Sequence, residues 1–179
     1  GNAWSNTLVA RIPLSIRGGW DTLVSTGNVI YSHASSGAVM ENNTISGTWT
    51  VNRNVYHANA HNVTFDDDGN IRTLAQWQSA HSGFDANSTA TNSSKPLDAV
   101  FVVPNPVEAK RGHVAVYNWT KANNVTVDVS SFLSNGDTYS LFSAQNYSAG
   151  AIQSGTLSGS TISVPMTNLT TAPKPYGKT

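Results

Sequence analysis

The sequence carries Asn28-Val-Ile-Tyr31 and, 26 residues further on, Asn54-Val-Tyr56. Asn43-Thr-Ile45 lies between these two stretches and Asn62-Val-Thr64 follows them, so Asn repeatedly precedes a β-branched residue. Short strands that recur at intervals of roughly 20 to 30 residues are typical of a β-solenoid, in which each repeat forms one coil. Asn suits the corners, because it tolerates the left-handed backbone region and its amide can hydrogen-bond to the next coil. The first half is therefore predicted to stack two or three coils, with a ladder of Asn side chains at one corner.

The second half of the chain has a different pattern, with short β-rich stretches separated by turns. There are six of them: Ala99–Val103, His113–Tyr117, Val125–Val129, Thr138–Phe142, Ala151–Gly155 and Thr161–Val164. Within the third, Val alternates with polar residues, as in a strand with one buried face. Such strands, separated by Asn, Gly, Ser and Asp, predict a small antiparallel β-sandwich. We place the domain boundary within residues 86–96, which gives domains 1–94 and 95–179.

Helical periodicity is confined to one segment, Ile71–Ala80, where Leu74 and Trp77 are three residues apart. Thr73 can cap this helix, and good helix formers follow it. The chain as a whole is therefore predicted to be all-β with one short helix.

Composition excludes several functions. The 179 residues include ten basic and ten acidic side chains, so the formal net charge is zero, and charged residues make up only 11%. Such a chain lacks the basic surface that binds nucleic acid. No apolar run approaches the roughly 18 residues that span a bilayer, so no membrane association is expected. Without cysteine, neither disulfides nor thiolate metal sites can form. A composition rich in Asn, Ser and Thr, together with many β-branched residues, indicates an extracellular or cell-surface β-protein.

Two stretches, Glu41-Asn-Asn-Thr-Ile-Ser46 and Arg53-Asn-Val-Tyr56, resemble coils of bacterial right-handed parallel β-helix proteins of the pectate-lyase-like superfamily. The passage from Asn54 to Gln78 is similar to the end of such a helix, where the last coil leads into a hairpin and a short helix ending in a tryptophan. The segment from Val102 through Tyr117-Asn-Trp119 to Val164-Pro-Met166 resembles the small β-sandwich often fused after it. The resemblance runs from around residue 20 to residue 170.

This resemblance implies the last coils of a right-handed parallel β-helix over residues 1–94 and an antiparallel β-sandwich over 95–179. Family members have many coils, so the chain is expected to be the C-terminal part of a larger bacterial protein. Such proteins are often secreted and act on polysaccharides as lyases or glycosidases, with sites on middle coils that are missing here. We therefore expect a non-catalytic capping and carbohydrate-binding module. Its expected partners are a polysaccharide and either more coils upstream or a second chain at the open coil end.

Aromatic side chains next to small polar residues are candidates for stacking on sugar rings, while amides and hydroxyls read the sugar hydroxyls. The candidate carbohydrate-binding residues are Trp4, Trp20, Trp49 and Tyr147. Ordinary packing is the competing interpretation for each of them. Trp77 and Trp119 are expected in the core.

Metal binding has one candidate, the acidic run Asp66-Asp-Asp-Gly-Asn70. Carboxylates at alternate positions with a Gly resemble part of a calcium loop, with Asp66, Asp68 and Asn70 as ligands. The run lacks the downstream Glu of that loop, and a hairpin turn with Asp-Gly at its tip explains it equally. No cofactor is otherwise expected. His57 and His61 have a spacing that suits a metal only on a helix, and none is predicted there.

No catalytic residue is assigned, because the remaining carboxylates are scattered singly and no nucleophile or phosphate-binding motif is present. Arg53 beside His57 could supply a neutralising cation and a base for lyase chemistry. The alternatives are a polysaccharide lyase or glycoside hydrolase with its groove on the coils, and a structural or adhesive surface protein. An enzyme would be favoured by two acidic side chains, or a base with an Arg, that converge in one cleft.

Overall fold

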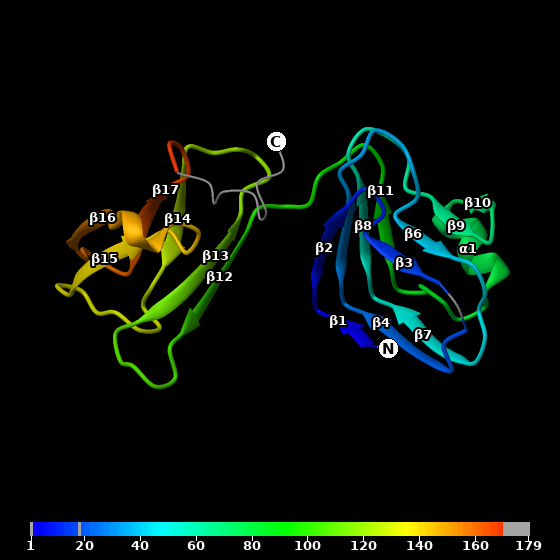
Figure 1. Ribbon diagram of the computed structural model, residues 1–179, viewed down its shortest axis with the longest axis horizontal. Helices are drawn as coiled ribbons and strands as arrows, with labels where there is room; N and C mark the ends of the chain where they lie inside the picture. Colours follow the sequence, from blue (N-terminus) through cyan, green and yellow to red (C-terminus); the bar gives the residue numbers. More distant parts are fainter. Residues whose placement is uncertain (1, 18, 170–179) are drawn as a thin grey trace. The chain divides into compact units, whose positions relative to one another are not determined.

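The computed structural model describes residues 2–17 and 19–169, which divide into two compact units, Gly1–Pro96 and Leu97–Thr179 (Figure 1). The protein is all-β, with parallel and antiparallel sheets and, in the described part, a single α-helix. Each unit has its own hydrophobic core.

The first unit passes through three sheets in the same cyclic order three times, and we call each passage a coil. Its strands are β1 (Asn2–Trp4), β2 (Thr7–Ala10) and β3 (Leu14–Ile16) in coil 1, β4 (Thr22–Thr26), β5 (Val29–Ser32) and β6 (Met40–Asn42) in coil 2, and β7 (Thr48–Asn52), β8 (Val55–Ala58) and β9 (Phe65–Asp67) in coil 3. Equivalent strands pair in parallel between neighbouring coils. This arrangement is compatible with a β-helix-like fold.

Side chains at equivalent positions of the coils stack inside the first unit. Ile30 pairs in register with Tyr56, and Met40 with Phe65, and all four are buried. The ring of Tyr56 meets that of Phe65 edge to face, with centroids 4.9 Å apart. Because successive side chains of a strand point to opposite faces, one residue in two along each strand enters this core. Each such side chain contributes about 1.5 to 3 kcal/mol through burial.

The corners between strands differ in one respect from the prediction. We expect Asn28 and Asn54 themselves in the left-handed backbone region, and this is wrong. The residue before each corner Asn has positive φ instead: 66° at Gly27 and 56° at Arg53. Asn28 and Asn54 are not among the residues with positive φ. The preference for Asn at these corners therefore comes from the hydrogen bonds of its side chain.

A closing segment follows coil 3. The strand β10 (Asn70–Arg72) pairs antiparallel with β9, helix α1 (Leu74–Ala80) follows, and β11 (Thr89–Thr91) pairs with β8. Thr73 caps α1 as predicted, and the side chain of Gln76 completes the capping box. The helix begins at Leu74 and not at Ile71, because Ile71 belongs to β10. Within the described residues, no helix has the length and apolar character needed to cross a membrane.

The second unit contains three antiparallel pairs. They are β12 (Ala99–Pro104) with β13 (Gly112–Tyr117), β14 (Asn124–Asp128) with β17 (Thr161–Pro165), and β15 (Thr138–Phe142) with β16 (Ala151–Thr156). All six predicted strands are confirmed within two residues at their ends. A short 3-10 helix, Tyr147–Ala149, precedes β16. The hydrophobic core of the second unit includes the buried residues Val127, Val129 and Ile162.

Candidate functional site

Amide side chains form a ladder along one interior corner of the first unit. Asn6 donates from both its backbone N–H and its Nδ2 to Oδ1 of Asn28, at 3.0 and 3.2 Å. Asn28 donates in the same way to Oδ1 of Asn54, at 3.0 Å for both bonds. Asn28 and Asn54 are fully buried, so these bonds satisfy groups that would otherwise be costly to bury. The predicted ladder is confirmed for these two residues, whereas Asn43 and Asn62 lie outside it.

The ladder ends on a buried carboxylate in the closing segment, Asp85. Asn54 Nδ2 reaches its Oδ1 at 3.3 Å, Ser88 Oγ donates to the same oxygen at 2.5 Å, and Trp77 Nε1 donates to Oδ2 at 2.9 Å. Tyr56 Oη lies 3.1 Å from both oxygens. Burial, and then the charge of Asp85, raise the pKa of Tyr56 well above its ordinary value, so the phenol stays a donor. The carboxylate of Asp85 is therefore held by four uncharged hydrogen-bond donors and not by a cationic side chain.

A second buried amide, that of Asn42 at the end of β6, also bonds to an aspartate, Asp67 at the end of β9. Asn42 Nδ2 donates to Oδ1 of Asp67 at 3.0 Å, while Arg72 Nε and His81 Nε2 reach Oδ2 at 2.7 and 2.9 Å. Burial alone would raise the pKa of Asp67, but these three partners outweigh it and hold the pKa below its ordinary value. Asp67 is therefore ionised at neutral pH and joins coil 2, the β9–β10 hairpin and the end of α1.

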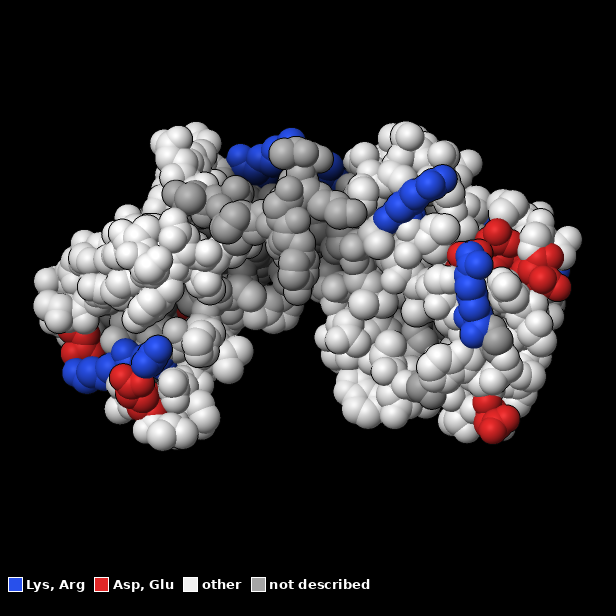
Figure 2. Space-filling view, viewed as in Figure 1, with Lys and Arg blue, Asp and Glu red and all other residues white. Residues whose placement is uncertain are grey.

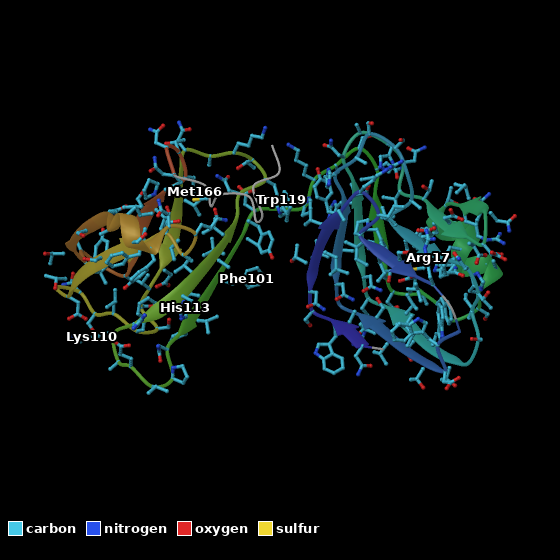
Figure 3. All side chains as sticks on the ribbon, in the orientation of Figure 1. Arg17, Phe101, Lys110, His113, Trp119 and Met166 are labelled. Carbon is cyan, nitrogen blue, oxygen red and sulfur yellow. The ribbon has the colours of Figure 1, made fainter. Side chains whose placement is uncertain are left out.

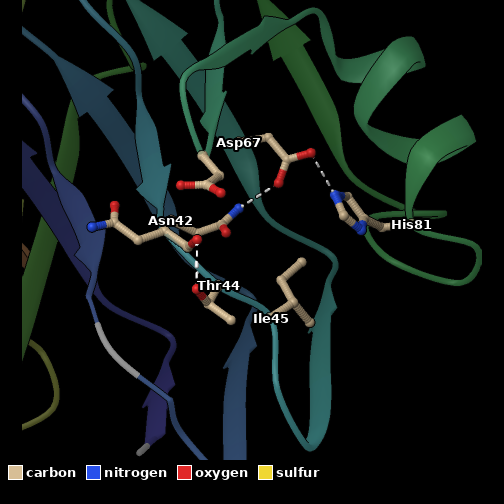
Figure 4. A pocket seen from close by; sticks show the side chains of 7 residues that line it. Asn42, Thr44, Ile45, Asp67 and His81 are labelled. Atoms are coloured by element: carbon tan, nitrogen blue, oxygen red, sulfur yellow. Dashed lines mark hydrogen bonds and ion pairs between the residues drawn. The ribbon is translucent and has the colours of Figure 1, made fainter.

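An open pocket of about 410 Å³ lies beside Asp67 (Figure 4). The loop after β6 supplies Asn43, Thr44 and Ile45, and the closing segment supplies Asp68 and His81. The ring of His81 packs on Trp77, with centroids 4.3 Å apart. Asp68 donates its backbone N–H to the carbonyl of Asn42 at 2.8 Å, and no ion pair joins its carboxylate to another described residue. The pocket therefore combines hydrogen-bonding groups with one aliphatic wall.

Acidic side chains gather at this edge of the first unit, while most of the visible surface is uncharged (Figure 2). A second cavity of about 410 Å³ has Glu41, Asp66 and His61 in its lining. Glu41 and Asp66 are register partners on β6 and β9. Arg17, which follows β3 (Figure 3), pairs with Glu41 at 2.5 Å.

The proposed metal ligands lie in the β9–β10 hairpin. Asp66 Oδ1 accepts from Gly69 N–H at 2.8 Å, and both turn residues, Asp68 and Gly69, have positive φ. This is the Asp-Gly hairpin turn that we weigh against a calcium loop. Among the described residues, no three His, Asp or Glu side chains form a group that could hold a metal. Calcium binding by Asp66, Asp68 and Asn70 stays a prediction.

The four candidate sugar-stacking residues fall into two classes. Trp4, Trp20 and Tyr147 are exposed, at 59%, 42% and 61%. Trp49 is buried: its Nε1 donates to the carbonyls of Trp20 and Ser46, and its face is turned to Phe84. A ring enclosed in this way offers no face to a sugar, so Trp49 belongs to the core. Burial follows from how coils stack, which local sequence does not reveal.

The two tryptophans expected in the core and the two candidate histidines differ in burial. Trp77 is buried as predicted, but Trp119 is only partly buried and stacks on Tyr117, near the exposed Phe101 (Figure 3). His57 lies on β8, where burial lowers its pKa. His57 Nδ1 and His61 Nε2 are buried without a hydrogen-bond partner.

Sequence reasoning missed Asp67, His81 and Asp85. Asp67 stands between the proposed calcium ligands but was not one of them, His81 and Asp85 stand in segments with no chemical motif, and the partners of the three residues are 3 to 31 residues away in the chain. The only available signal is that Asn42 and Asp67 are 25 residues apart, close to the spacing of the Asn repeat.

Comparisons with models of protein families, with curated proteins and with solved structures return no match.

Proposed function

We propose that this chain is a non-catalytic C-terminal capping and carbohydrate-binding module of a secreted, polysaccharide-active bacterial β-helix protein. The three coils would be the last turns of a right-handed, pectate-lyase-like parallel β-helix, and the second unit a β-sandwich. The observation that carries the capping role is that the amide ladder ends on Asp85 in the closing segment, and that the buried amide of Asn42 likewise bonds to Asp67, next to that segment.

The chemistry of the ladder explains why an aspartate stops it. An amide accepts from one neighbour and donates to the next, so it can pass the ladder from coil to coil. An ionised carboxylate only accepts, and it has no donor for a further coil. Together with α1 and β10, such an end protects strand edges and apolar interior that an open stack would expose.

The opposite end of the coils has the properties of a docking surface. Strands β1, β2 and β3 each pair on one side only with other described strands. Asn6 is exposed, and no described residue donates to its Oδ1. A partner would continue the ladder by presenting an amide donor there, either from further coils or from a second chain. The aspartate end of another copy offers acceptors, which disfavours head-to-tail filaments and with them the structural or adhesive alternative.

Glycan binding is supported by the exposure of Trp4, Trp20 and Tyr147, which leaves ring faces open to stack on sugars. The test is native affinity electrophoresis of the full chain through gels that carry soluble plant, algal and microbial polysaccharides. We expect one polysaccharide to retard the protein and Trp20→Ala to abolish the retardation. Phe101→Ala, which truncates a ring outside the proposed set that is 51% exposed, compared with 42% for Trp20, is the control. Unchanged mobility in every gel contradicts glycan binding and leaves the capping role alone.

The enzyme alternative has one observation in its favour. Glu41 and Asp66 lie in register on neighbouring strands and line one cavity, so two carboxylates share a cavity, as a glycoside hydrolase would need. A lyase or hydrolase of this kind would release unsaturated or reducing ends from the retarding polysaccharide, and Glu41→Gln would stop their release. Absence of new ends after prolonged incubation with the wild-type chain supports the non-catalytic role.

A further inference from the structure

We propose that the pocket lined by Asn43, Thr44, Ile45, Asp68 and His81 binds one sugar residue of a glycan that carries no carboxylate. The inference rests on the proposed glycan binding and adds a site and a ligand class to it. The pocket volume of about 410 Å³ falls within the range of about 300 to 1,000 Å³ that small-molecule sites occupy.

The hydrogen bond between His81 and Asp67 determines what the imidazole offers to a ligand. Ionised Asp67 can only accept, so His81 Nε2 must carry the proton of their 2.9 Å bond. In the neutral ring the other nitrogen, Nδ1, is then an acceptor. No described residue donates to it. In this neutral form, His81 presents the acceptor Nδ1 to a pocket that is open to solvent (Figure 4).

The remaining polar groups favour ligands that donate hydrogen bonds. Asp68 is exposed at the hairpin tip and adds a carboxylate without an ion-pair partner among the described residues. Thr44 already donates its hydroxyl to the carbonyl of Asn43 at 2.7 Å, which leaves the amide of Asn43 as the adaptable group. Sugar hydroxyls, or the ammonium of an amino sugar, match these acceptors. A uronate would bring its charge next to Asp68, which has no ion-pair partner among the described residues, and would be repelled.

The neighbouring corner loop connects this pocket to a stacking ring. Trp49 Nε1 bridges the carbonyls of Trp20 and Ser46, at 2.9 and 3.0 Å, and an added Cβ on Gly19 would lie 2.9 Å from Ser46 Oγ. The loop that carries Trp20 therefore packs against the loop that carries Asn43, Thr44 and Ile45. Under this proposal, another sugar residue of the same glycan stacks on Trp20 while one residue occupies the pocket.

The experiment titrates the full chain with three hexasaccharide probes: neutral gluco-oligosaccharides, glucosamine oligomers and oligogalacturonate. Calorimetry gives the affinity, and the NMR shifts of the His81 ring report on the pocket. We expect the first or second probe to shift the His81 resonances with the calorimetric Kd, and oligogalacturonate to bind about 2- to 5-fold more weakly. Asp68→Asn and His81→Gln should each weaken binding by about 3- to 10-fold.

The matched control is Asp21→Asn, which removes the same charge from an exposed residue beside Trp20 but outside the pocket. It should change the affinity less than about twofold. If Asp68→Asn and His81→Gln bind like wild type while Trp20→Ala does not, glycan binding holds and the pocket proposal is overturned. Equal affinity for oligogalacturonate overturns the ligand class. If none of the probes binds and no polysaccharide retards the protein, the proposed glycan binding fails together with this inference.

Discussion

Asp85 is the residue on which the closing segment depends most. Replacing it with Ala leaves the buried Tyr56 hydroxyl and Trp77 indole N–H without an acceptor. We expect Asp85→Ala to lower the free energy of unfolding of the first unit by at least about 3 kcal/mol, and Asp85→Asn, which keeps one acceptor, to cost less. Urea denaturation followed by tryptophan fluorescence measures both. Equal losses in the two variants would mean that the hydrogen bonds do not account for the effect.

Asp67 makes the closing segment sensitive to acid. Its pKa is held below the ordinary 3.8, so the unfolded chain takes up this proton more readily than the folded chain. The contribution of Asp67 is therefore complete above the unfolded pKa and is lost as pH falls through the folded pKa. The protection factors of the α1 amides in hydrogen exchange, measured from pH 6 down to the acid limit of folding and corrected for the intrinsic exchange rate at each pH, should fall more steeply in wild type than in Asp67→Asn. Identical profiles would show that Asp67 does not control this step.

Among the elements, the amide ladder distinguishes residues that look alike in the sequence. Asn54 and Asn62 both precede Val, yet only Asn54 is buried and bonded to coil 2 on one side and to Asp85 of the closing segment on the other. Asn54→Ala should lower the free energy of unfolding by about 2 to 4 kcal/mol, because Asn28 loses the acceptor of two bonds. Asn62→Ala should change it by less than about 0.5 kcal/mol. Thermal or urea unfolding of the two variants side by side tests the ladder.

The turn before β7 needs glycine for two reasons. Gly47 has φ of 89°, and an added Cβ would lie 2.3 Å from the carbonyl oxygen of Asp21, which directly precedes β4. Gly69 has φ of 83° but nothing within 4 Å of its Cβ position. Gly47→Ala should therefore destabilise by more than about 3 kcal/mol, while Gly69→Ala should cost only about 1 kcal/mol of backbone strain. Circular dichroism melts of both variants give the comparison, and equal melting temperatures would contradict it.

At the scale of the whole molecule, the two units should survive separation of the chain between them. Each has its own core, and Leu97 at the start of the second unit is 89% exposed. Thermolysin, which cuts before large apolar residues, should cleave the native protein first near Leu97 and leave two fragments that resist further digestion. Mass spectrometry identifies the cut. Rapid loss of either fragment would mean that this unit does not fold alone.

The sequence by itself determined the features that arise from short-range chemistry. Short β-rich stretches between turn residues predicted the six strands of the second unit, and Thr73 marked the start of α1. The 26-residue spacing of Asn28 and Asn54 predicted their ladder. The sequence did not predict that Asn6 belongs to the ladder. Asn6 stands only 22 residues before Asn28, because the loops of the coils differ in length and the repeat is irregular.

Only the tertiary structure decided which of several similar residues are functional candidates. Stacking of the coils buries Trp49 but exposes Trp20, and it makes Asn54 a ladder residue while Asn43 lines a pocket. It also brings His81 to Asp67 and Trp77 to Asp85. Burial and hydrogen-bond partners depend on which coil lies above or below a residue. That relation is set by the stacking of whole coils and leaves no trace in the neighbouring sequence.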